Sequence, residues 1–169
     1  MRRLILTLSV AAALVAVAQP AEAQFKYGLQ GALLTGLEDV NTLDGTIGIG
    51  PRVAFQPPLL PIGVVGQGVY YFPDCGGADC SYLTYSLAGQ LRLPLPMVNP
   101  YVIGGWQWRR ASAGGNSATE NGAMLGIGVQ LNLAVSVFLE GTMEFNDAPA
   151  ANIDADNAIV IKGGVLLGG

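Results

Sequence analysis

The feature that most constrains the fold is a period-two alternation of apolar with small or polar side chains, which recurs in segments of roughly ten residues. In a β-strand, such alternation sends successive side chains to opposite faces. Between residues 46 and 55, apolar positions alternate with Thr, Gly, Arg and Ala, and the stretches 83–93, 125–132 and 135–144 repeat the pattern. The sequence therefore predicts an all-β chain whose strands carry one bulky apolar face and one small, polar face.

Breaks rich in turn residues divide the chain into eight segments, each near the length at which a tilted strand crosses a bilayer. The predicted strands are 25–34, 44–55, 59–72, 81–94, 100–109, 121–133, 134–145 and 157–168. The third and fifth keep their faces unassigned, because Gly and apolar residues occupy both. An even number of antiparallel strands in meander order is typical of closed transmembrane β-barrels.

The composition indicates that water is not the only solvent of this chain. Charged residues make up 12% of it and Gly 24 of 169 residues, against averages of about 25% and about 7% in soluble domains. After the N-terminal segment no apolar run is long enough for a spanning helix, so a closed barrel is the remaining spanning structure. Eight strands enclose little space, and we therefore expect the bulky apolar face to point outward.

The N-terminal segment predicts export. Two arginines precede an apolar run from Leu4 to Val17, and Ala21-Glu22-Ala23 has the small-x-small pattern that signal peptidase cleaves. We expect residues 1–23 to be a signal peptide and residues 24–169 to form one outer-membrane barrel domain. That domain has six basic and eleven acidic side chains, a net charge of −5, which argues against nucleic acid as a partner.

Aromatic residues near strand ends predict two girdles at the lipid-water boundaries. One rim is expected to hold Phe25, Tyr27, Phe55 and Tyr101. The other is expected to hold Tyr70, Tyr71, Phe72, Tyr82, Trp106, Trp108 and Phe145. A soluble core would instead place its aromatic residues at strand centres, where this chain has only Phe138.

The predicted connections alternate between short, partly Pro-rich turns and longer polar segments. The turns are 56–58, 95–99 and 132–134, and the longer segments are 35–43, 73–80, 110–120 and 146–156. In outer-membrane barrels the short turns face the periplasm and the long loops face outward. We therefore expect an acidic outer face formed by Glu38, Asp39, Asp74, Asp79, Glu120, Asp147, Asp154 and Asp156.

Six charged side chains fall on the predicted inward face: Lys26, Arg52, Arg92, Glu140, Glu144 and Lys162. Because a narrow lumen solvates charge poorly, we expect them to pair and plug the barrel; a gate for ions or protons is the alternative. A last hairpin that turns around Ala151 would place Glu140 opposite Lys162.

Cys75 and Cys80 are the only cysteines, and in an oxidising compartment they predict a disulfide within one outer loop. No catalytic, cofactor or metal site is predicted. The chain has no His, which removes the commonest general base and a frequent zinc ligand. Glu140 and Glu144 lie four positions apart on one strand, roughly 13 Å, too far for a glycosidase pair.

With these features the chain resembles the small eight-stranded outer-membrane β-barrel proteins of Gram-negative bacteria, those like OmpX and the barrel domain of OmpA. The stretch NPYVIGGWQWRR, Asn99 to Arg110, is similar to a strand in the second half of such proteins, whereas Leu166-Leu167-Gly168-Gly169 departs from their usual terminal aromatic residue. The resemblance implies a monomer in the bacterial outer membrane, with membrane lipid and the barrel-assembly machinery as partners. It also implies a structural or surface-interaction role through the outer loops, with a surface partner that is unknown.

Two alternatives remain open at this point. A small channel for apolar solutes would share the barrel, and a soluble periplasmic carrier similar to lipocalins would turn the apolar face inward around a ligand. Cell fractionation distinguishes them, because a carrier leaves with the periplasm while a membrane barrel needs detergent.

Overall fold

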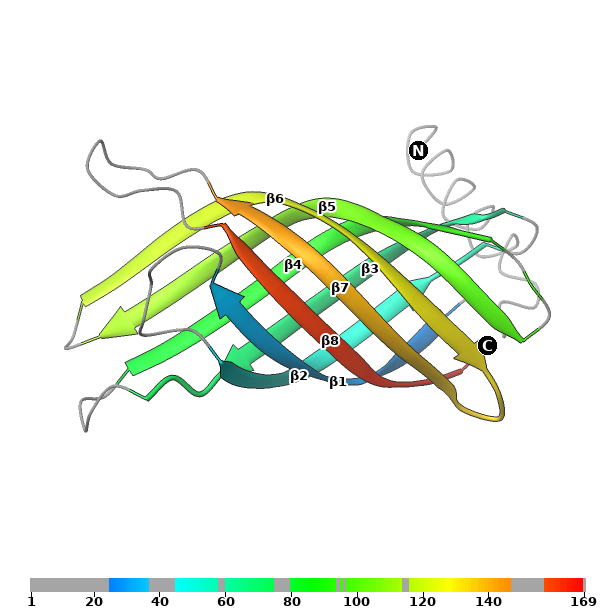
Figure 1. Ribbon diagram of the computed structural model, residues 1–169, viewed down its shortest axis with the longest axis horizontal. Coiled ribbons are helices and arrows are strands. Elements are labelled where there is room, and N and C mark those ends of the chain that lie inside the picture. Colours follow the sequence, from blue (N-terminus) through cyan, green and yellow to red (C-terminus); the bar gives the residue numbers. More distant parts are fainter. Residues whose placement is uncertain are drawn as a thin grey trace, which may run out of the picture.

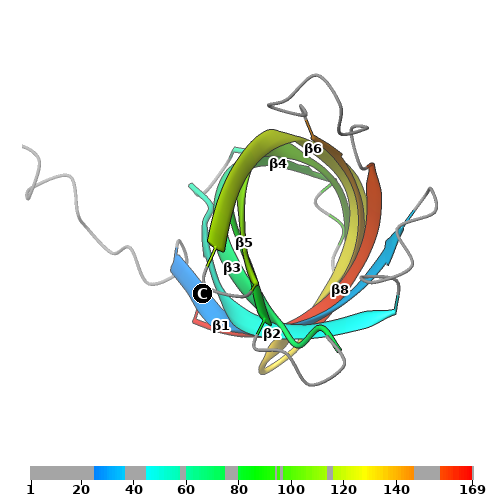
Figure 2. The ribbon, with the colours of Figure 1, turned by 90° about the vertical axis from the view of Figure 1, so that its left-hand side faces the viewer.

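The computed structural model describes residues 25–36, 45–57, 60–74, 80–93, 95, 97–113, 116–146 and 157–168. Eight antiparallel strands follow one another around a closed barrel, and β8 pairs with β1 (Figures 1 and 2). They are β1 (Phe25–Gly36), β2 (Thr46–Phe55), β3 (Ile62–Tyr71), β4 (Cys80–Arg92), β5 (Val98–Ala113), β6 (Asn116–Asn132), β7 (Ser136–Asn146) and β8 (Ala158–Leu167). The closed meander barrel predicted from the alternation is confirmed. No helix in these ranges is long and apolar enough to cross a membrane.

The connection predicted over residues 110–120 is wrong, because most of it is strand. β5 continues to Ala113 and β6 begins at Asn116, and these two residues pair with each other. The stretch has only small or polar residues on both faces, so it lacks the bulky apolar alternation that marks the other strands. In Figure 1 the β5–β6 hairpin extends beyond the other strand ends.

The bulky apolar side chains point away from the lumen. Ile127 and Ile47 are 70% and 65% exposed, whereas Arg52 and Glu140, on the opposite parity, are 2% and 1% exposed. This arrangement suits a lipid-facing surface. The carrier alternative is therefore wrong, since it requires the apolar face to line an internal cavity.

The third and fifth strands, whose faces the sequence left open, also send apolar residues inward. Val65, Val69 and Tyr71 of β3 are at most 2% exposed, as is Ile103 of β5. They contribute to two buried apolar clusters, one around Val69 and Tyr71 and the other around Val65 and Ile103. The lumen is therefore filled by apolar as well as polar side chains.

Three of the predicted girdle residues are misplaced, because Tyr71, Tyr82 and Tyr101 point into the barrel and are at most 5% exposed. The period of two explains why Tyr71 points inward, since it directly follows the outward Tyr70. The centre of the Tyr71 ring lies 5.4 Å from the centre of the Tyr82 ring inside the barrel. The other predicted girdle residues lie on the outer surface and are exposed or half-buried: Phe25, Tyr27, Phe55, Tyr70, Phe72, Trp106, Trp108 and Phe145.

Candidate functional site

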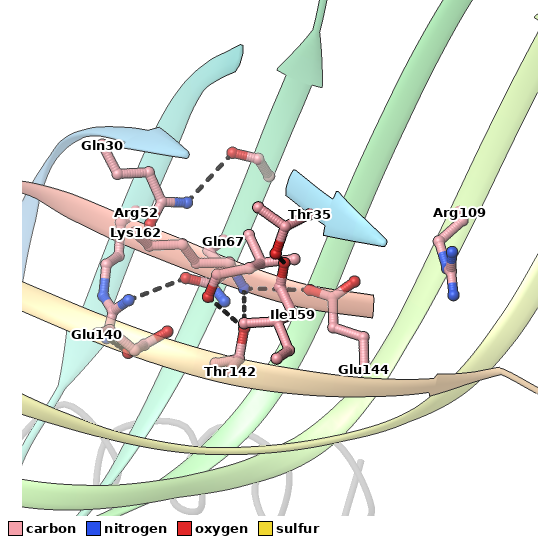
Figure 3. A network of polar contacts seen from close by, with 12 residues as sticks. Gln30, Thr35, Arg52, Gln67, Arg109, Glu140, Thr142, Glu144, Ile159 and Lys162 are labelled. Atoms are coloured by element: carbon pink, nitrogen blue, oxygen red, sulfur yellow. Dashed lines mark hydrogen bonds and ion pairs between the residues drawn. The ribbon is translucent and has the colours of Figure 1, made fainter. Parts of the chain in front are cut away.

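The centre of the lumen is crossed by an ion pair between strands that are not neighbours. Arg52 of β2 donates from its guanidinium to Oε2 of Glu140 on β7, over 2.8 Å, and both side chains are almost fully buried (Figure 3). The Tyr101 hydroxyl donates to the same carboxylate oxygen at 3.0 Å. Arg52 also donates to Oε1 of Gln67 at 2.9 Å, and its guanidinium lies 4.2 Å from the centre of the Phe138 ring.

Local sequence explains why these groups meet. Arg52 and Glu140 both occupy inward positions of strands with clean alternation. Gly128 pairs with both Tyr101 and Glu140, and a Cβ at this position would collide with the Tyr101 ring. A glycine is therefore required where the tyrosine crosses the β6 backbone to reach the carboxylate.

A second ion pair lies beside the first. Nζ of Lys162 is 3.3 Å from Oε1 of Glu144 and donates to the Thr142 hydroxyl at 3.2 Å (Figure 3). The expected register is present, since Glu140 and Lys162 are opposite each other. The expected ion pair between these two residues is wrong. Register determines which backbones are neighbours, but the long Lys162 side chain reaches Glu144 while Arg52 occupies the Glu140 carboxylate from across the lumen.

Arg109 of β5 also points into the lumen, and it was missed because the faces of the fifth predicted strand were left unassigned. Arg109 is 6% exposed, and its guanidinium donates to the Tyr82 hydroxyl at 2.9 Å. It also lies opposite Glu120 of β6. Continuing the period-two count from Gln107, which is 1% exposed, would have placed Arg109 inside.

The remaining two predicted lumen cations lie at the other end of the barrel, beside the short turns. Lys26 is half-buried and donates to Oδ1 of Asn132 at 3.1 Å and to the Ser136 hydroxyl at 2.9 Å. Arg92 is 5% exposed and donates to Oε1 of Gln90 at 3.1 Å. Neither is drawn into the central ion pairs.

Chemically, the centre of the lumen is an arrangement of paired charges. Each central carboxylate is bound to a cation, and Gln30, Gln90 and Gln130 are buried between strands at 1% to 2% exposure. In the part of the chain that the structure describes, no three His, Cys, Asp or Glu side chains gather into a group that could hold a metal ion.

Gly128→Ala is expected to displace Tyr101 from Glu140 and to destabilise the folded barrel. The added methyl would overlap the phenol ring, and overpacking of this kind costs about 1 to 3 kcal/mol. Urea titration of the detergent-solubilised protein measures the change. Gly141→Ala is the matched control, because nothing lies within 4 Å of the Cβ it would add; an equal loss in both variants would contradict the packing argument.

The predicted disulfide falls partly outside the described residues. Cys80, the first residue of β4, is disulfide-bonded, while Cys75 lies outside the described ranges, so the pairing of the two stays a prediction. Most of the predicted acidic outer positions lie outside them too. Of the two that do not, Asp74 is exposed and Glu120 is half-buried.

Replacing both cysteines by Ser is expected to lower the free energy of unfolding by only about 1.5 to 2.5 kcal/mol, because a loop this short removes little unfolded-state entropy. Thiol titration of protein purified without reductant gives the direct check. Two reactive thiols per chain would contradict the predicted pairing.

The family follows from a comparison with protein-family profiles. The profile of the outer membrane protein beta-barrel domain matches residues 5–162. The chain belongs to this family. A comparison with curated protein sequences gave no match.

Solved structures share the architecture of this outer membrane barrel at low sequence identity. Neisserial surface protein A has a TM-score of 0.63 and 15% identity, and the match covers 85% of this chain and 96% of that one. The N-terminal barrel of Pseudomonas aeruginosa OprF has a TM-score of 0.58 and 10% identity, and the match covers 84% of this chain and 97% of that one. Ail of Yersinia pestis has a TM-score of 0.56 and 18% identity, and the match covers 86% of this chain and 99% of that one. At such identities the likeness extends to the fold alone.

Proposed function

We propose that the protein is an exported, monomeric outer-membrane barrel with a structural or surface-interaction role carried by its acidic outer connections, and with no enzymatic activity. The observation that supports this most is the occupied lumen. Arg52, Glu140 and Tyr101 bridge its centre, so the groups available to a partner from outside are those on the connections at the far end from the short turns.

The charges of those connections favour a basic partner. Segments 37–44, 73–79 and 147–156 contain seven of the eight predicted outer acids, together with Asp44, and no Lys or Arg. Ail has been crystallised with the heparin analogue sucrose octasulfate, a polyanion. Like charges suppress binding and opposite charges accelerate it, so we expect this chain to prefer a polycation.

The test uses the full-length protein in phospholipid nanodiscs, with poly-lysine and heparin as the two probes on a biosensor. Poly-lysine is expected to bind in a salt-dependent manner, and heparin is not. A variant with Asp147, Asp154 and Asp156 changed to Asn should bind poly-lysine more weakly, whereas Arg110→Gln, which removes an exposed cation, should bind it at least as well. Heparin binding without poly-lysine binding would overturn the assignment.

Membrane location is tested separately by fractionation of the producing cells. We expect the protein in the envelope fraction, released only by detergent, with residues 1–23 removed, and with different gel mobility before and after boiling. Release in soluble form by osmotic shock would contradict the proposal.

A further inference from the structure

The end of the lumen beside the short turns contains a cavity of about 370 Å³. Its polar lining comes from the ends of five strands and from the turn after β2: Lys26, Arg92, Asn99, Asn132, Ser136 and Gln56. We call this cavity the vestibule. A water molecule occupies about 30 Å³ in the liquid, so the vestibule has room for a small ion with part of its hydration shell.

The vestibule has an excess of positive charge. Lys26 and Arg92 line it, and no Asp or Glu does so among the residues described. The two central carboxylates are bound elsewhere, Glu140 by Arg52 and Glu144 by Lys162. Among the residues that the structure describes, Lys26 and Arg92 donate side-chain hydrogen bonds only to neutral oxygens. Lys26 donates to Asn132 and Ser136, and Arg92 donates to Gln90. They also repel each other.

Buried hydrogen-bond donors in the same place point to a missing acceptor. Nε of Arg92 and Nδ2 of Asn99 have no acceptor within the described ranges, and the two residues are only 5% and 7% exposed. Nε2 of Gln90, whose Oε1 accepts from Arg92, is also buried without an acceptor within these ranges. Native proteins rarely leave buried donors unsatisfied. Water would satisfy the donors but would not neutralise two cations.

We propose that the vestibule binds a small oxyanion, with inorganic phosphate as the model ligand, taken up from the periplasmic side. A tetrahedral oxyanion accepts several N–H bonds at once and carries the opposite charge, and a guanidinium fork matches its geometry. Arg92, Asn99 and Lys26 all line this site; the first two are almost fully buried and Lys26 is half-buried. The site is at the opposite end of the barrel from the acidic connections, so it does not depend on the proposed surface role.

The test is a titration of the full-length protein, ¹⁵N-labelled in phosphate-free detergent micelles, with sodium phosphate at constant ionic strength. The Nε–H signal of Arg92 and the side-chain amide of Asn99 are expected to shift and saturate. Calorimetry of Arg92→Gln should show binding weakened by about tenfold or more, the effect of losing one hydrogen bond between charged groups. Lys26→Gln should also weaken it, and Arg110→Gln, the exposed control, should not.

The wild-type titration decides the matter even if a variant fails to assemble. An Arg92 signal that does not move with phosphate, or that moves equally with chloride, overturns the proposal. So does phosphate binding that is unchanged in both Arg92→Gln and Lys26→Gln. A parallel titration with phosphatidylglycerol in mixed micelles separates the sources: a response to the lipid headgroup without one to inorganic phosphate overturns the assignment to a free oxyanion.

Discussion

Glu140→Ala is expected to lower the free energy of unfolding by about 3 to 5 kcal/mol, the range for removing one partner of a buried ion pair. The variant leaves the Arg52 guanidinium buried at 2% exposure without its carboxylate. The Tyr101 hydroxyl loses its acceptor at the same time. Urea titration, followed by the gel mobility of unheated samples, measures the folded fraction.

The double variant Arg52→Met with Glu140→Leu separates lost charge pairing from lost packing. Removing both charges leaves no orphaned ion, so its destabilisation should fall well below the sum of the two single changes. Additive losses would show that the two side chains are not energetically coupled. That result would contradict the central bridge as a source of stability.

The sequence was sufficient for the fold because alternation, strand number and register are properties of the backbone period. In β2 every bulky apolar residue, Pro51 included, occupies an odd-numbered position, and the structure places these positions outside. A hairpin centred on Ala151 predicted Glu140 opposite Lys162, which is the observed register. Alternation, strand number and register can be predicted without knowing which conformations the side chains adopt inside the barrel.

Side-chain placement was harder wherever both faces of a strand carry apolar residues. In β5, Val102 points outward and Ile103 inward, so hydrophobicity cannot choose the face for Tyr101. Position near a strand end does not place a tyrosine in the aromatic girdle there. The tyrosine can also point inward when its hydroxyl donates a hydrogen bond to a buried carboxylate, as Tyr101 does to Glu140.

The ion-pair partners within the lumen could not be predicted from the sequence, for a different reason. Arg52 and Glu140 belong to β2 and β7, which share no backbone pairing, so they meet only because the barrel closes. Likewise, Arg92 and Lys26 were expected to join the paired charges. Their separation from both carboxylates depends on their position along the barrel axis, which alternation alone does not report.

In a planar bilayer the unmodified protein is expected to show at most rare, small openings. An eight-stranded barrel has an interior just wide enough for side chains, whereas aqueous channels appear at about sixteen strands. Here the bridge from Arg52 to Glu140 crosses the centre, and Phe138, 3% exposed, packs against the guanidinium. Passage of ions requires breaking that bridge, which is costly in a poorly solvated lumen.

Glu140→Ala should raise the frequency of these openings, because Arg52 then has no carboxylate to hold it across the lumen. Gly141→Ala, an outward position with no neighbour within 4 Å of the added Cβ, should conduct as the unmodified protein does. Single-channel recording of the three proteins under identical salt and voltage makes the comparison. Steady, large and weakly selective conductance from the unmodified protein would refute the closed lumen. Transport, including a channel for apolar solutes, would then replace the surface role as the better account of this barrel.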